Sequence, residues 1–100
     1  METETTTQWH LYIIRCRGGT LYTGIATDVD RRLQEHRSTG AKGAKYLRGR
    51  GPLELAYCRK IGDRGLALKV EYAVKRLSKA HKSRLITGAM SLDDIVYNHP

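Results

Sequence analysis

The sequence predicts an α/β (α+β) domain in which a small three-stranded sheet, mixed or antiparallel, is flanked by helices. Two runs of β-forming residues meet across Gly18-Gly19, a pair that favours a hairpin because both positions tolerate positive φ. Two segments with helical periodicity follow, and a third apolar stretch lies between them. The expected strands cover residues 9–16, 20–23 and 53–58, and the expected helices cover residues 27–36 and 64–78.

The length allows one domain, because 100 residues with 40% hydrophobic content bury only one modest core. We expect a flexible tail over residues 1–8, the domain itself over residues 9–86, and a C-terminal helical turn and tail over residues 87–100. A short third helix ends near Ile86, and Ser91 can cap the last helical turn.

The hairpin is expected to set two tyrosines on neighbouring strands. Alternation along the first strand places Leu11 and Ile13 on one face and Tyr12 on the other. Tyr22 lies in the second strand, and we expect Gly24 to end that strand. The absence of a side chain there would let a backbone or a ligand approach closely.

The first helix carries two polar side chains beside its apolar stripe. Thr27 or Asp28 can cap it, and Arg32 and His36 lie one turn apart at the edge of the stripe. An arginine offers a rigid fork of donors that suits phosphate, but an arginine on a helix is more often simply solvated.

The second helix holds a carboxylate on its apolar side. Burying the Glu71 charge there costs free energy unless the carboxylate is paired, for example with Lys75 four residues later, or bound to a metal ion. Its neighbours in that stripe are Ala67, Val70, Val74 and Leu77.

The charge distribution favours a polyanionic partner. The net charge is +8, and 16 of the 18 Lys and Arg residues lie between Arg31 and Arg84 with only four acids. Several of them lie within a glycine-rich loop over residues 37–52, in which Tyr46 could stack on a base or pack beneath its own loop. The residues of this loop that we expect to bind substrate are Lys45, Tyr46, Arg48 and Arg50.

Several classes of protein are disfavoured. No apolar run approaches the roughly 18 residues of a membrane span, so we expect no membrane partner. Cys16 and Cys58 have no paired metal spacing, and free thiols in the reducing cytoplasm are the simpler interpretation.

The ordered residues Tyr12, Tyr22-Thr23-Gly24, Arg32, His36 and Glu71 resemble the pattern of the GIY-YIG nucleases. The similarity extends over residues 9–86 and is closest to small, single-domain bacterial members of the YhbQ type. One departure is the asparagine that the family often has late in the domain, because the only asparagine here is Asn98.

The resemblance implies a metal-dependent endonuclease with one Mg²⁺ (or Mn²⁺) ion on Glu71. In the family one motif tyrosine usually activates water, a role that we assign to Tyr22. Tyr12 is the second candidate and an orienting group. Arg32 would bind the phosphate and His36 could relay a proton. The residues alone leave the general base open among Tyr12, Tyr22 and His36.

The expected substrate is DNA, bound through its phosphate backbone with low sequence specificity. Single-stranded or branched DNA would fit a role in repair or recombination, and we expect a monomer with Gly24 near the substrate. The alternative is a nucleic-acid-binding module whose nuclease site is vestigial. Such a module would bind DNA in a salt-dependent way without turnover.

Overall fold

The computed structural model describes residues 7–37 and 51–97 and contains one antiparallel sheet with the strand order β2-β1-β3. The central strand β1 (Trp9–Arg15) pairs with β2 (Leu21–Ala26) on one side and with β3 (Glu54–Gly62) on the other. A single turn of 3₁₀ helix, η1 (Arg17–Gly19), closes the β1–β2 hairpin. Both turn glycines have positive φ, as the sequence predicts.

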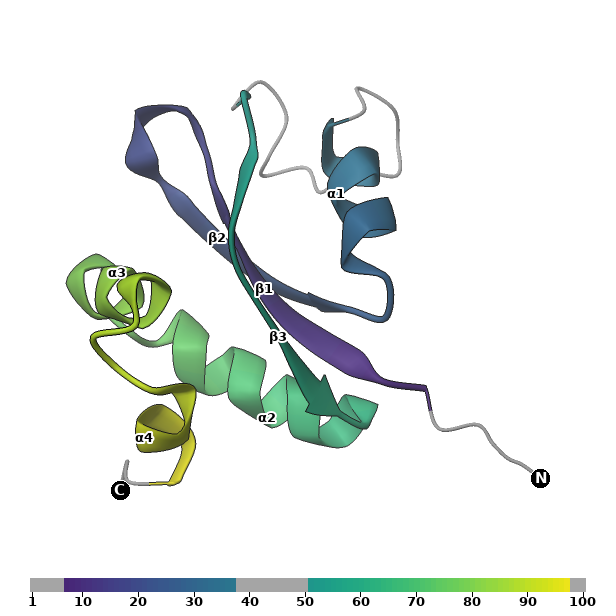
Figure 1. Cartoon of the computed structure of the whole chain (residues 1–100), viewed down its shortest axis with the longest axis vertical. Coiled ribbons are helices and arrows are strands. Elements are labelled where there is room, and N and C mark those ends of the chain that lie inside the picture. Colours follow the sequence, from purple (N-terminus) through teal and green to yellow (C-terminus); the bar gives the residue numbers. More distant parts are fainter. Residues whose placement is uncertain (1–6, 38–50, 98–100) are drawn as a thin grey trace.

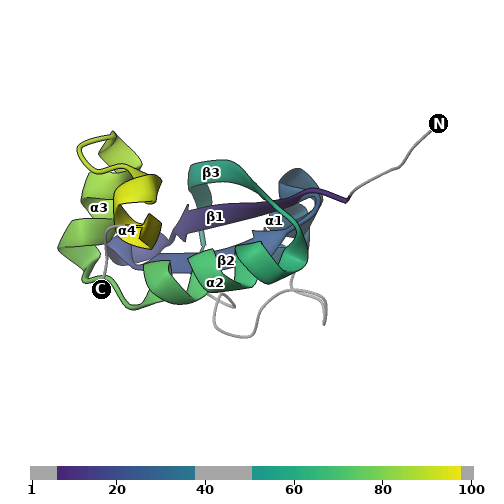
Figure 2. The same ribbon diagram turned by 90° about the horizontal axis from the view of Figure 1, so that it is seen from below.

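Helices cover both faces of the sheet (Figure 1). One face carries α1 (Val29–Arg37), and the other carries α2 (Arg64–Lys75), α3 (Lys79–Thr87) and α4 (Leu92–Tyr97). Helix α2 runs alongside β2 and makes contacts with it (Figure 2). The predicted fold class is confirmed, and the sheet is wholly antiparallel.

Alternation along β1 divides the core in two, as predicted. Tyr12 and Ile14 point toward α1, whereas Leu11 and Ile13 point toward α2 and are fully buried. The α2 side is packed by aliphatic residues from three helices, among them Val70, Val74, Leu85, Leu92 and Ile95.

Two predicted strand boundaries are wrong. The strand β2 does not end at Gly24 but continues to Ala26, because Gly24 pairs with Tyr12 of β1. The third strand runs four residues beyond Cys58 to Gly62, since all of this stretch follows β1.

The residues that cap the helices agree with expectation better than the strand boundaries do. The side chain of Asp28 accepts a hydrogen bond from the Arg31 backbone N–H at 3.1 Å and so begins α1. Asp63 caps α2 and Ser78 caps α3, so the expected helix over residues 64–78 ends earlier, at Lys75.

The C-terminal helix contributes to the core. Leu92 and Ile95 of α4 are 3% and 5% exposed and pack against the α2 side of the sheet. In the part of the chain that the structure describes, every helix is too short or too polar to cross a membrane.

Candidate active site

Three aromatic rings gather on the α1 face of the sheet. Tyr12 of β1, Tyr22 of β2 and His36 of α1 have ring centroids 5.5 to 6.5 Å apart, and Tyr22 meets His36 edge to face. Tyr12 and His36 are buried, whereas Tyr22 is only partly buried. Water therefore reaches the cluster more easily at Tyr22 than at Tyr12.

The strand register explains how the two tyrosines meet. Ile14 pairs with Tyr22, and Tyr12 pairs with Gly24, so the two tyrosines lie diagonally on one face. The Tyr12 ring crosses the backbone at Gly24, where a Cβ atom would lie 2.5 Å from the Tyr12 hydroxyl oxygen and 2.6 Å from Cζ. Gly24 therefore leaves room for Tyr12. No substrate contact is needed to explain it.

The Tyr12 hydroxyl links α1 to the sheet. Its oxygen lies 3.0 Å from Nε2 of His36, and Arg32 also forms a hydrogen bond with Tyr12. Burial raises the pKa of Tyr12 to about 12, and the charges of Tyr22 and Glu71 add to the rise, whereas Arg32 opposes it. Tyr12 is thus protonated at neutral pH.

His36 is neutral at the same pH. Burial lowers its pKa below the usual 6.5, the positive charge of Arg32 lowers it further, and Glu35 offsets part of this effect. Since Arg32 donates to the Tyr12 oxygen, the single Tyr12 proton is left for Nε2 of His36. This arrangement favours the His36 tautomer with its own proton on Nδ1.

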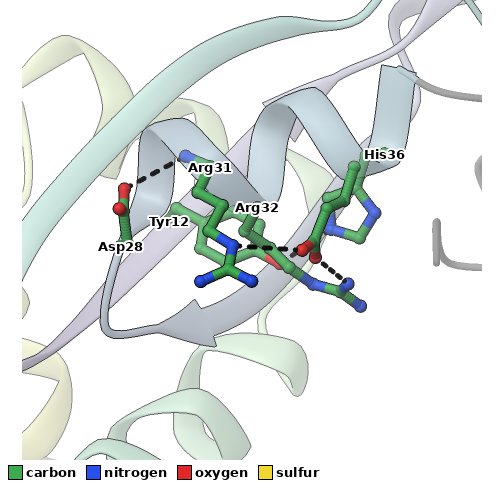
Figure 3. A network of polar contacts seen from close by, with 6 residues as sticks. Tyr12, Asp28, Arg31, Arg32 and His36 are labelled. Atoms are coloured by element: carbon green, nitrogen blue, oxygen red, sulfur yellow. Dashed lines mark hydrogen bonds and ion pairs between the residues drawn. The ribbon is translucent and has the colours of Figure 1, made fainter.

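Glu35 holds two arginines of α1, as Figure 3 shows for Arg31 and Arg32. It accepts from Nη1 of Arg32 at 2.8 Å and lies 3.5 Å from Nε of Arg31. The sequence indicated the pair with Arg31 but not the shorter one with Arg32. The signal was the i,i+3 spacing, which brings two side chains together on a helix.

Glu71 lies on α2, on the other side of the sheet from His36, yet its negative charge contributes to the raised pKa of Tyr12 as the weakest of several influences. Its side chain is 18% exposed and forms an ion pair with Lys75 at 3.2 Å. The simpler expectation of an i,i+4 pair is therefore confirmed, and the carboxylate still reaches the electrostatic environment of the tyrosines.

The donor set suits a hard cation that keeps most of its water ligands. In residues 7–37 and 51–97, no group of three or more His, Cys, Asp or Glu side chains could hold a metal ion. One partly exposed carboxylate such as Glu71 matches the way Mg²⁺ is commonly bound, by one or two carboxylates with waters and substrate oxygens.

An open pocket of about 300 Å³ adjoins Arg32. Arg31 and Glu35 line it from α1, and Trp9 and Thr27 line it from the sheet and the following turn. The expected substrate residues Lys45, Tyr46, Arg48 and Arg50 lie outside the described residues, as does Asn98.

Comparison with known families matches residues 8–84 to the GIY-YIG catalytic domain. Among curated proteins, the UPF0213 protein YhbQ of Escherichia coli O8 is 56% identical over 90 residues, which cover 90% of this chain and 88% of that protein. The UPF0213 protein YhbQ of Salmonella arizonae is 48% identical with the same coverage.

Two solved structures have the same fold. The UPF0213 protein BH0048 from Bacillus halodurans is 38% identical with a TM-score of 0.53, and the comparison covers 92% of this chain and 96% of that one. The protein EF2693 from E. faecalis is 31% identical with a TM-score of 0.58, covering 89% and 91% of the two chains.

Proposed function

The chain belongs to the GIY-YIG family, and we propose that it is a metal-dependent endonuclease that hydrolyses phosphodiester bonds in DNA. One observation carries the proposal. Arg32 and His36 both contact the Tyr12 hydroxyl, and the Glu71 charge acts on the same hydroxyl from another helix. An apolar core alone gives no reason to gather Tyr12, Arg32 and His36, or to place a carboxylate within electrostatic reach of them.

Arg32 is the proposed phosphate ligand. It is partly exposed beside an open pocket, and its guanidinium can exchange the Glu35 carboxylate for a phosphate oxygen of similar geometry. In hydrolysis the phosphoryl oxygens gain negative charge, which this guanidinium would stabilise.

Tyr22 is the proposed acceptor of the proton from the attacking water. Tyr12 is a poor candidate, because it is 2% exposed and its pKa is raised to about 12. Tyr22 can accept a proton only after losing its own. His36 is neutral and would take up a proton at Nε2 by way of the Tyr12 hydroxyl, which would pass its own proton to Nε2 and accept the proton of Tyr22 in its place. Tyr12 then orients His36 through the hydrogen bond to Nε2.

Glu71 is the proposed ligand of one divalent ion, Mg²⁺ or Mn²⁺. The ion, when bound, would supply charge neutralisation at the phosphate and at the departing oxygen. Lys75 would have to release the carboxylate, and its own side chain is 53% exposed, so water can solvate the ammonium group after release.

The proposed substrate contacts are mainly with the DNA backbone, in keeping with the net charge of +8. Low sequence specificity would suit a monomeric cytoplasmic enzyme of DNA repair or recombination. The loop residues Lys45, Tyr46, Arg48 and Arg50 are part of the proposed substrate surface, whereas Gly24 serves to admit the Tyr12 ring.

The test is cleavage of end-labelled single-stranded, duplex and flap DNA in the presence of Mg²⁺, Mn²⁺ or EDTA. We expect cleavage only with a divalent ion, and a loss on the order of a hundredfold or more for Glu71→Ala and for Glu71→Gln. Circular dichroism and thermal melting of both variants should remain close to those of the unmodified protein.

Glu54→Gln is the matched control, because Glu54 is likewise a carboxylate paired with a cation, Arg15, but its side chain is 68% exposed. Undiminished cutting by Glu71→Gln would overturn the assignment. Salt-dependent binding without any cleavage would instead favour the alternative, a non-catalytic nucleic-acid-binding module.

A further inference from the structure

Tyr72 is a large aromatic side chain that the fold does not bury. It follows Glu71 directly on α2 and is 64% exposed, more than Leu66 or Leu68 on the same helix. A tyrosine ring on the surface offers a flat apolar face to a ligand together with a polar edge that stays hydrated.

The Tyr72 ring is nevertheless held in one place. Nη1 of Arg76 donates a hydrogen bond to the Tyr72 hydroxyl at 2.9 Å, and the Arg76 guanidinium carbon lies 5.4 Å from the ring centroid. Because the ring is already restrained in the free protein, a ligand that stacks on it loses less conformational entropy on binding.

Cations surround the ring. Lys69, Lys75 and Arg76 stand three or four positions from Tyr72 and are all exposed, so they border it on the helix surface. The adjacent acid, Glu71, has a side chain only 18% exposed and paired with Lys75. A flat aromatic surface within a cationic border complements a ligand that alternates bases with phosphates.

We propose that Tyr72 is a stacking platform for an unpaired base of a nucleic-acid strand, with Lys69, Lys75 and Arg76 at the neighbouring phosphates. The relation of this platform to the cleaved bond rests on the proposed function, since Tyr72 adjoins Glu71 in sequence but projects about 100° away from it around α2. Bases inside a duplex are already stacked on each other, so the platform selects single-stranded segments such as flaps and gaps.

The experiment measures binding in EDTA, where no cleavage occurs. The probes are a single-stranded oligonucleotide carrying 2-aminopurine, whose fluorescence is quenched by stacking, and a blunt duplex of the same sequence. For Tyr72→Ala we expect single-strand affinity to fall on the order of tenfold, with loss of the quenching, and duplex affinity to change little. Tyr72→Phe keeps the ring and should keep the quenching.

Leu66→Ala is the matched control, because Leu66 is an exposed apolar residue on a different side of α2 and should leave both affinities unchanged. Unchanged single-strand affinity and quenching in Tyr72→Ala would overturn the proposal, and so would an equal loss for the duplex. Cleavage is scored separately. An inactive protein that still quenches through Tyr72 would refute the nuclease assignment but not the platform.

Discussion

The two faces of the sheet have different chemistry although they share the same strands. The α2 face is packed by aliphatic side chains from β1 and three helices, including Leu11, Ile13 and Val74. The α1 face buries Tyr12 and His36, whose polar atoms are joined by a hydrogen bond. Neighbouring residues of one strand, Leu11 and Tyr12, therefore belong to different environments.

The difference indicates that the two faces have different roles, one in stability and the other in the candidate site. Burial of apolar area stabilises both faces, but the α1 face also buries polar groups, which are costly unless they are paired. A site assembled from such groups needs a stable support, and the central strand joins the two. Substitutions on the two faces should accordingly change different measured quantities.

The largest expected effect is on stability, from Leu11→Ala. Leu11 is fully buried on the α2 face, so its truncation should lower the free energy of unfolding by about 2–5 kcal/mol in urea titrations. The folded fraction should still cut DNA at the normal rate. A specific rate that falls further than the folded fraction would show that the faces are coupled.

The next effect is on catalysis, from Arg32→Ala. We expect the cleavage rate to fall about a hundredfold, on the order of 3 kcal/mol of barrier. Arg31→Ala is the control, because Arg31 shares the partner Glu35 but its side chain is 73% exposed. Equal losses for the two variants would mean that general charge, and not a placed guanidinium, explains the result.

Gly24→Ala tests the contact between the strands. The added methyl would collide with the Tyr12 ring, and we expect a loss of about 1–3 kcal/mol of stability together with reduced cleavage. Adding Tyr12→Leu should restore stability without restoring cleavage. If Gly24→Ala alone were as stable as the unmodified protein, the close contact between Gly24 and the Tyr12 ring would be contradicted.

The smallest expected effect is the pH dependence that His36 confers. Its pKa is lowered on folding, so the unfolded chain takes up a proton first as the pH falls below about 6.5, and stability declines toward the folded pKa. Urea titrations at about pH 7.5 and pH 5.5 should show a smaller decline for His36→Gln than for the unmodified protein. His81→Gln, at an exposed position, should retain the full decline.

Local pattern was sufficient to predict much of this molecule. Alternation assigned Tyr12 and Leu11 to opposite faces, and helical spacing placed His36 beside the apolar stripe of α1. These features depend only on residues close in sequence, for which geometry is nearly fixed by the type of secondary structure.

Features that depend on distant residues were missed or left open. Gly24 was expected to end a strand because its partner Tyr12 cannot be identified without the register. The bond between Tyr12 and His36 joins residues 24 positions apart, and the burial that sets their protonation comes from packing. Leu92 and Ile95 were assigned to a C-terminal helical turn and tail after the domain, because nothing local shows that α4 docks.

The crossing of Tyr12 over Gly24 also has a consequence for how such sequences can evolve. The space at position 24 depends on the size of the side chain at position 12. Substitutions at the two positions should therefore be correlated among related chains. A larger residue at position 24 becomes acceptable only after position 12 has become smaller, and that first step removes the hydroxyl that contacts His36. Position 24 should therefore remain glycine in every related chain that keeps tyrosine at position 12.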